Sequence, residues 1–255
     1  MTVLRVTDER VSVEDSVAIQ HATTGSELRD GYLEDVRKLS AGLIRVRGSA
    51  LYVGPIELLR FGQAKVTRRA VEWPIEGGIL APAAGGRFRI EADSGRLVAS
   101  VESYRPLLPL PIYRVTQLPI HHLFIRLHLL RVRGRDPLPG MAASSQDRWR
   151  AAMVDLALCV ALTGVISKRP RVRALLGVAA AYHVTCWSTS GRTLGGLVMR
   201  QRVVAVDGSR PTVGQSLVRL LALPFGWARD RPVQDDIAGT TVVKSPPSPL
   251  QGRGA

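Results

Sequence analysis

Two long apolar stretches in the second half of the chain limit what it can fold into. The first covers residues 151–167 and contains one charged residue, Asp155, and the second covers residues 174–187. Both are apolar on nearly every helical face, which is typical of helices buried in a large core or in lipid. A region of about 120 residues is too small to bury two such helices fully. The sequence therefore predicts a helical hairpin in a membrane, and two core helices of a soluble domain are the alternative.

The lengths of these stretches are compatible with a membrane. A spanning helix needs about 20 apolar residues, so both stretches lie near the lower limit and would need flanking Arg and Trp side chains at the interface. A third apolar stretch, residues 216–227, contains Arg219 and Pro224. It is too short to span alone, so it could be re-entrant, interfacial or buried in protein.

The first half of the chain has a different pattern, in which short apolar runs alternate with turn signals. Residues 87–101 are typical of a β-hairpin, because alternating segments flank Asp93-Ser94-Gly95. We expect residues 77–86 to form a strand between glycines, and residues 27–39 to form a helix with Ser26 as its N-cap. An antiparallel sheet is the natural result.

Together these patterns predict an α+β protein. A mostly antiparallel β domain occupies residues 1–135, and a small helical membrane domain with a short surface hairpin occupies residues 148–244. The Pro- and Gly-containing residues 136–147 are expected to be a linker, and the Pro-rich residues 245–255 a disordered tail.

The end of the β domain, residues 104–134, is ambiguous. Apolar residues after Pro119 fit an amphipathic helix, whereas alternation in residues 124–134 fits a strand. The segment could lie at a membrane interface or cover the core of the β domain. His121, His122 and His128 lie here without acids or cysteines at ligand spacing, so we predict no metal site.

The net charge is a weaker constraint than the apolar stretches. Lys and Arg number 35 against 21 Asp and Glu, for a formal charge of +14, but only four of the basic residues are Lys and Asn is absent. This bias is typical of a G+C-rich genome. The basic residues are spread out and only 5% of residues are aromatic, so nucleic-acid binding is not indicated.

Basic residues cluster near the ends of the two long apolar stretches, which suits an anionic lipid surface. Nine lie in the outer flanks and four in the joining loop, residues 168–173. By the positive-inside rule, this count favours both termini in the cytoplasm.

An acid inside an apolar membrane helix costs about 2.5–3.5 kcal/mol, so Asp155 should have a polar partner. Arg148 lies seven residues earlier on the same helical face. Arg219 and His183 are further candidates for this partner.

Arg148 and Asp155 are followed by further motifs in a fixed order. Gly191-Arg192-Thr193-Leu194-Gly195 follows the second stretch. The block Val203–Gly208 comes next, and residues 203–213 predict a short surface hairpin around Asp207-Gly208. Arg219 lies in the third stretch, and Asp235 precedes Ala238-Gly239-Thr240. Over about residues 146–244, this pattern resembles the RDD family of bacterial membrane proteins.

The resemblance implies a multi-pass protein of the bacterial cell membrane, with transport of a small ion or solute proposed for some members. Its implied polar cluster is Arg148, Asp155 and Asp235, and its supporting residues are Arg192, Thr193, Gly195, Arg219, Gly239 and Thr240. Gly196 and Asp236 stand where family members often carry basic residues.

Two function classes follow from the sequence. The first is transport of a small ion or solute, which needs a homo-oligomer because two or three helices cannot enclose a pathway. The second is a membrane-anchored module whose β domain binds a lipid, peptide or protein. No nucleophile, paired-carboxylate or metal constellation is visible, so we expect no enzyme activity, no catalytic residues and no cofactor. The expected partners are the bilayer and its anionic headgroups.

Overall fold

The computed structural model describes residues 2–7, 10–166, 172–227 and 232–245. The chain divides into two compact units, Met1–Gly134 and Arg135–Ala255. Most of the predicted joining loop, residues 168–173, and most of the predicted tail, residues 245–255, lie outside the described residues. Each unit is described below by itself.

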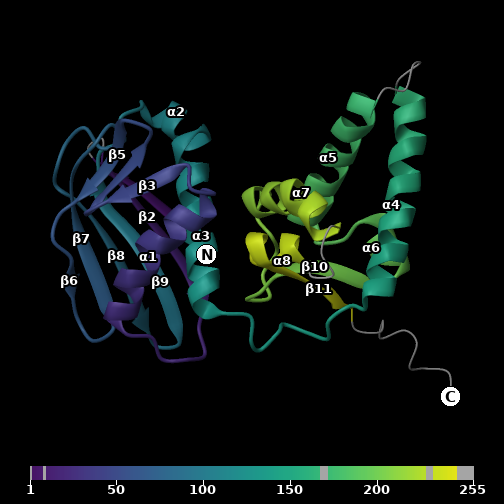
Figure 1. The fold of residues 1–255 in the computed structure, drawn as a ribbon, viewed down its shortest axis with the longest axis horizontal. Helices are drawn as coiled ribbons and strands as arrows, with labels where there is room; N and C mark the ends of the chain where they lie inside the picture. The colour runs from purple at the N-terminus through teal and green to yellow at the C-terminus, as the bar shows by residue number, and fades with distance from the viewer. Residues whose placement is uncertain (1, 8–9, 167–171, 228–231, 246–255) are drawn as a thin grey trace. The chain divides into compact units, whose positions relative to one another are not determined.

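The first unit is built on a nine-stranded sheet in which every pairing is antiparallel (Figure 1). The strand order is β1-β2-β9-β8-β7-β5-β4-β3, and β6 pairs with β7. The strands are β1 (Thr2–Thr7), β2 (Arg10–Ala18), β3 (Ile44–Arg47), β4 (Ala50–Val53), β5 (Ile56–Phe61), β6 (Lys65–Val66), β7 (Ala70–Gly77), β8 (Gly86–Asp93) and β9 (Arg96–Tyr104). The predicted α+β class with an N-terminal antiparallel sheet is confirmed.

The predicted hairpin is β8 and β9. Asp93 pairs with Arg96, and the two residues between them have positive φ, 48° at Ser94 and 76° at Gly95. Positive φ at both central positions matches the right-handed twist of the flanking strands.

Two expectations for this unit were wrong in detail. The strand expected over residues 77–86 is absent, because residues 78–85 form turns between β7 and β8 in which Ile79 and Leu80 donate their amides to the carbonyls of Glu57 and Leu58 in β5. Helix α1 (Gly25–Leu39) begins earlier than expected, with Thr24 as its N-cap in place of Ser26. Thr24 and Glu27 form a reciprocal capping box, which satisfies two otherwise unpaired amides.

The ambiguous segment is helical and covers the core of the sheet. Helix α2 (Leu110–Val115) leads into α3 (Gln117–Arg133), and α3 packs beside α1 over β2 and β9 (Figure 1). Buried Ile125, Leu127, Leu129 and Leu130 face this core. Two of its histidines anchor the helix to other elements by hydrogen bonds: His122 Nδ1 lies 2.6 Å from Asp15 Oδ2, and His128 Nδ1 lies 2.8 Å from Asp35 Oδ2.

The second unit contains five helices and a small sheet among its described residues. Its elements are α4 (Ser145–Ile166), α5 (Val172–Thr189), α6 (Leu194–Val198), β10 (Gln201–Ala205), α7 (Val213–Trp227), α8 (Val233–Ala238) and β11 (Thr240–Lys244). The local hairpin predicted around Asp207-Gly208 was wrong. Strand β10 pairs with β11 near the end of the described chain, and Asp207-Gly208 is a turn after which the chain enters α7.

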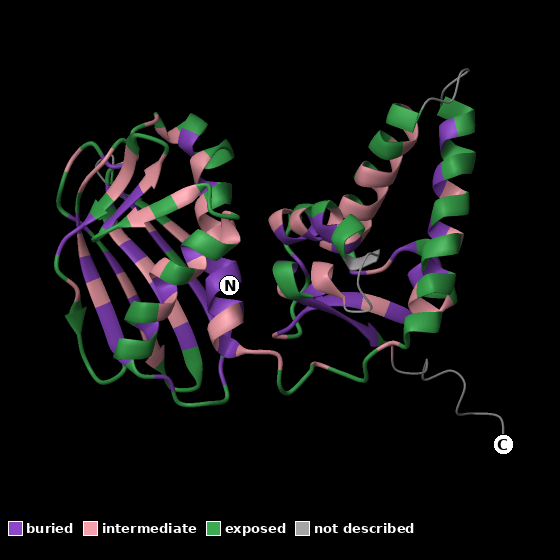
Figure 2. Ribbon diagram, in the orientation of Figure 1, coloured by how far each residue is buried: buried purple, intermediate pink, exposed green. Residues whose placement is uncertain are grey.

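Within the described part of the chain, one helix, α4, is long and apolar enough to cross a membrane. Figure 2 shows that α4 and α5 leave much of their surface exposed. Helix α4 buries a single row at four-residue spacing, namely Ala151, Asp155, Cys159 and Thr163. Large apolar side chains remain exposed elsewhere on it, including Met153, Leu156, Val160, Val165 and Ile166. Such a face suits lipid better than water.

Candidate functional site

Asp235 is the centre of a buried ionic cluster in the second unit. Helix α8 places this residue where it is only 1% exposed. Arg148, from the first turns of α4, donates from Nη2 to Asp235 Oδ2 at 2.5 Å. Arg219 of α7 forms an ion pair with the other oxygen, Oδ1. One carboxylate therefore ties together three helices.

Thr240 extends this cluster to β11. Its hydroxyl donates to Asp235 Oδ1 at 3.0 Å and accepts from Arg219 Nη1 at 2.8 Å, while Arg135 Nη2 donates to its carbonyl at 2.9 Å. Arg135 also pairs with the exposed Asp236 at 2.6 Å. The structure thus brings together Arg148, Asp235, Arg219 and Thr240.

Asp155 lies in a second polar centre, which contains neither of the arginines considered as its partners. Tyr182 donates its hydroxyl to Asp155 Oδ1 at 2.8 Å, and the amide of Gly195 donates to the same oxygen at 2.8 Å. The guanidinium groups of Arg148 and Arg219 are directed to Asp235 instead. Asp155 thus has polar partners, on α5 and α6, but neither Arg148 nor Arg219, the two candidate arginines, is among them.

His183 is close to Asp155 without a short contact. Its Nε2 lies 4.0 Å from Asp155 Oδ2, while its Nδ1 lies 2.8 Å from the carbonyl of Ala179. Since a carbonyl only accepts, Nδ1 must carry a proton. The other ring nitrogen, Nε2, therefore faces the carboxylate of Asp155.

Aromatic contacts join the two centres along α5. The ring of His183 lies 5.0 Å from that of Trp187, and the Arg219 guanidinium lies 5.1 Å from the centre of the same Trp187 ring. Trp187 therefore stands between the Asp155 centre and the Asp235 centre.

The remaining predicted residues hold the backbone in place. Thr193 caps the N-terminus of α6, and a Cβ on Gly195 would collide with the carbonyl of Ala151. Gly239 has a φ of 60° and ends α8 in the left-handed conformation. Arg192 lies in the loop before α6, where its amide donates to Ser190 Oγ at 3.1 Å.

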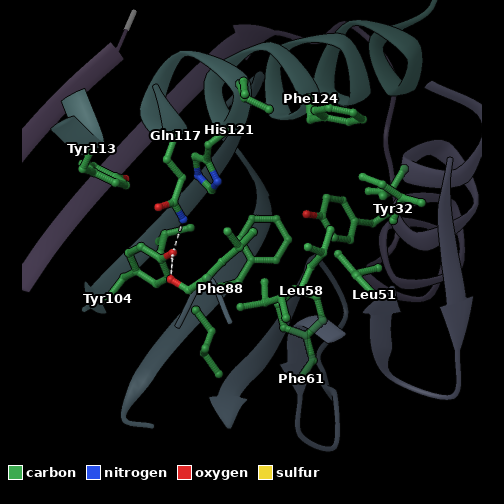
Figure 3. A pocket seen from close by; sticks show the side chains of 17 residues that line it. Tyr32, Leu51, Leu58, Phe61, Phe88, Tyr104, Tyr113, Gln117, His121 and Phe124 are labelled. Carbon is green, nitrogen blue, oxygen red and sulfur yellow. Dashed lines mark hydrogen bonds between the residues drawn. The ribbon is translucent and has the colours of Figure 1, made fainter. Parts of the chain in front are cut away.

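The first unit contains a cavity that sequence reasoning missed. It has a volume of about 170 Å³ and lies between α1, α3 and the sheet (Figure 3). Most of its lining is apolar: Val36, Ile44, Leu51, Leu58, Leu59, Phe61, Ile75, Leu80, Phe88, Val101, Ile120 and Phe124. Ile120 is 59% exposed and stands at its edge.

Polar side chains meet at the end of the cavity near the start of α3. Gln117 donates from Nε2 to the hydroxyl of Tyr104 at 2.5 Å, and that hydroxyl donates to the carbonyl of Leu80 at 2.5 Å (Figure 3). Gln117 Oε1 and His121 Nε2 are buried and have no hydrogen-bond partner among the described residues. Burial, and then the neighbouring His122, lower the pKa of His121 to about 4, so its ring is neutral at physiological pH.

A sequence signal for this site exists in part. Gln117 and His121 are four residues apart, so a helical reading places them on one face. The strands that complete the cavity are distant in sequence, which periodicity alone does not reveal.

The second unit is defined by apolar helices tied together by buried Asp and Arg residues, an arrangement that fits a membrane domain. The family model described as RDD family matches residues 172–242. The chain therefore contains an RDD family membrane domain, and the resemblance seen in the sequence is confirmed over this range. Arg192, Thr193, Gly195, Arg219, Asp235, Gly239 and Thr240 lie inside the matched range, and Arg148 and Asp155 precede it.

The chain is also similar to an uncharacterized protein of Rickettsia prowazekii (strain Madrid E). The two are 36% identical over 78 residues, which is 27% of this chain and 45% of that relative. The match thus spans less than half the length of the curated relative. No solved structure matches the chain.

Proposed function

We propose that this protein is a membrane-anchored binding protein. In this proposal the RDD domain holds the chain in the bacterial cell membrane, and the N-terminal domain binds a small, mainly apolar molecule. The cavity between α1, α3 and the sheet is the observation that carries the proposal. An apolar cavity of about 150 Å³ in another protein stays dry and binds benzene, so about 170 Å³ is enough for a ligand of similar size.

The proposed membrane arrangement rests on the second unit. Helices α4 and α5 form the hairpin, both termini lie in the cytoplasm, and basic flanks face anionic headgroups. The exposed apolar side chains of α4 and the 15-residue apolar helix α7 support insertion. The ion pairs of Asp235 satisfy the charges that such a domain has to bury.

The binding proposal is tested with the full chain in lipid nanodiscs. Toluene is added, and hydrogen exchange is measured on peptides from α3 and β9. We expect protection in these peptides for the wild type and its loss in Leu58→Trp, which fills the cavity. Leu43→Trp is the matched control, because Leu43 is 68% exposed. Equal responses of the wild type and Leu58→Trp would contradict the proposal.

Transport of a small ion or solute by a homo-oligomer is the second candidate. The Asp155–His183 pair favours it, because a buried carboxylate oxygen lies 4.0 Å from a histidine ring nitrogen, where a proton or cation could bind between them. The structure also supports a purely anchoring role for Asp155, since Oδ1 already accepts two hydrogen bonds.

Asp155→Asn separates these roles, because its amide oxygen can still accept from Tyr182 and Gly195. Proton and cation flux is measured in proteoliposomes that contain wild type, Asp155→Asn or Asp236→Asn. Transport through this pair predicts flux that is lost only in Asp155→Asn. Absence of flux in the wild type, or unchanged flux in Asp155→Asn, excludes this candidate.

A further inference from the structure

The polar end of the N-terminal cavity has a fixed hydrogen-bonding direction. Tyr104 uses its single hydroxyl hydrogen on the carbonyl of Leu80, at 2.5 Å. It must therefore accept from Gln117, and only the amide nitrogen of Gln117 can donate. This orients the Gln117 amide, so that Oε1 faces away from Tyr104 and remains an acceptor.

Two buried polar atoms at this end have no partner among the described residues. They are Gln117 Oε1 and His121 Nε2, and both residues line the cavity (Figure 3). Their residues are one helical turn apart on α3, so the two side chains lie on the same face. A buried polar atom without a hydrogen bond is costly, so a ligand group that satisfies both atoms would gain affinity here.

The cavity also carries no formal charge. None of the described residues that line it is Lys, Arg, Asp or Glu. An ionised ligand group would therefore lose its hydration without a counter-charge. A carboxylate has a second disadvantage, because it only accepts hydrogen bonds and cannot serve Gln117 Oε1.

We propose that the cavity selects a small apolar molecule that carries one uncharged hydroxyl group, such as an aromatic or short-chain alcohol. The hydroxyl hydrogen is donated to Gln117 Oε1, and its oxygen accepts from His121 Nε2 in the tautomer that is protonated there. The apolar body lies against Phe88, Phe61 and Leu58. This inference rests on the proposed function, since it specifies the ligand of the same cavity.

The test compares ligands that share one aromatic ring and differ in the group attached to it. Benzyl alcohol, toluene, benzoate and benzylammonium are titrated onto the full chain in nanodiscs. The measurement is the ligand concentration that gives half-maximal protection of α3 peptides against hydrogen exchange. The variant Leu58→Trp, whose cavity is filled, measures how much protection comes from ligand dissolved in the bilayer. We expect benzyl alcohol to bind about threefold to tenfold more tightly than toluene, and both ions to bind more weakly than toluene.

The double variant Gln117→Leu/His121→Phe checks whether these two residues bind the ligand hydroxyl. It should retain toluene binding and lose the preference for benzyl alcohol, whereas the exposed control His21→Phe should keep that preference. Equal binding of benzyl alcohol and toluene by the wild type, or tighter binding of benzoate, overturns the hydroxyl inference and leaves the cavity proposal intact. If no ligand gives protection above the Leu58→Trp background, both proposals fail.

Discussion

Arg148 Nη2 donates to Asp235 Oδ2 at 2.5 Å, although 87 residues separate the two in sequence. This contact joins the start of α4 to α8. Because Arg219 binds the other oxygen of the same carboxylate, Asp235 neutralises part of the charge of two guanidinium groups. The second unit therefore depends on one buried acid for the arrangement of three helices.

Replacing Asp235 with Asn should destabilise this unit by about 3–5 kcal/mol, because the buried Arg219 and the partly buried Arg148 would both lose their counter-charge. Asp236→Asn is the matched control. Its side chain is 57% exposed and pairs with Arg135 at the surface, so its loss should cost less than about 1 kcal/mol. Thermal unfolding of both variants in the same lipid nanodiscs gives the comparison. Similar unfolding temperatures for the two variants would contradict the assigned role of Asp235.

Gly195→Ala should also destabilise the second unit. The new Cβ would meet the carbonyl of Ala151, and α6 would have to move away from α4 and weaken the bond from its amide to Asp155. Gly164→Ala is the control, because a Cβ there meets nothing within 4 Å. That change should be neutral or stabilise by about 0.5–1 kcal/mol through helix propensity. Unfolding temperatures that fall equally in both variants would argue against the close approach of α4 and α6.

Val160→Asp tests whether α4 lies in lipid. Val160 is 53% exposed, so in a soluble protein the change should alter stability by less than about 0.5 kcal/mol. In a membrane helix the same acid costs about 2.5–3.5 kcal/mol, and we expect less protein in the membrane fraction after carbonate extraction. Ile56→Asp, at 50% exposure in the first unit, should leave that fraction unchanged. A soluble wild-type protein would refute the membrane arrangement.

His121, which is half-buried and whose Nε2 atom is buried, should make the first unit less stable in acid. Its folded pKa is about 4, below the unfolded value of about 6.5, so the unfolded chain takes up a proton first as the pH falls. Stability is complete above about pH 6.5 and decreases towards pH 4, by about 1–2 kcal/mol at pH 5. Thermal unfolding at pH 7.5 and pH 5 should show this loss in the wild type and a smaller one in His121→Phe. An equal loss in both would show that other groups cause it.

The sequence predicted the parts of this fold that depend on local pattern. Alternation around Asp93-Ser94-Gly95 was sufficient for the β8–β9 hairpin, because turn chemistry and strand pairing lie within 20 residues there. The same local reasoning failed for residues 77–86, where the apolar run between the flanking glycines forms turns whose amides hydrogen-bond to β5. It failed again at Asp207-Gly208, because β10 finds its partner in β11, beyond two further helices.

The candidate site was likewise predicted only in part from the sequence. The residue types of the polar cluster were visible as motifs, and Arg148, Arg219, Asp235 and Thr240 do lie together. The partners of Asp155 were not predictable from helical spacing, because Tyr182 and Gly195 reach it from other elements. Arg148 lies two helical turns before Asp155 on the same face of α4, but its guanidinium binds Asp235 instead.

By itself, the sequence determined that this chain has an antiparallel β half and an apolar helical half, since both follow from the local periodicity of apolar residues. It also determined the RDD resemblance, which depends on the order of short motifs. Only the tertiary structure decided which acid each arginine binds and where the cavity lies. Those features come from contacts between residues far apart in sequence, which no local pattern encodes.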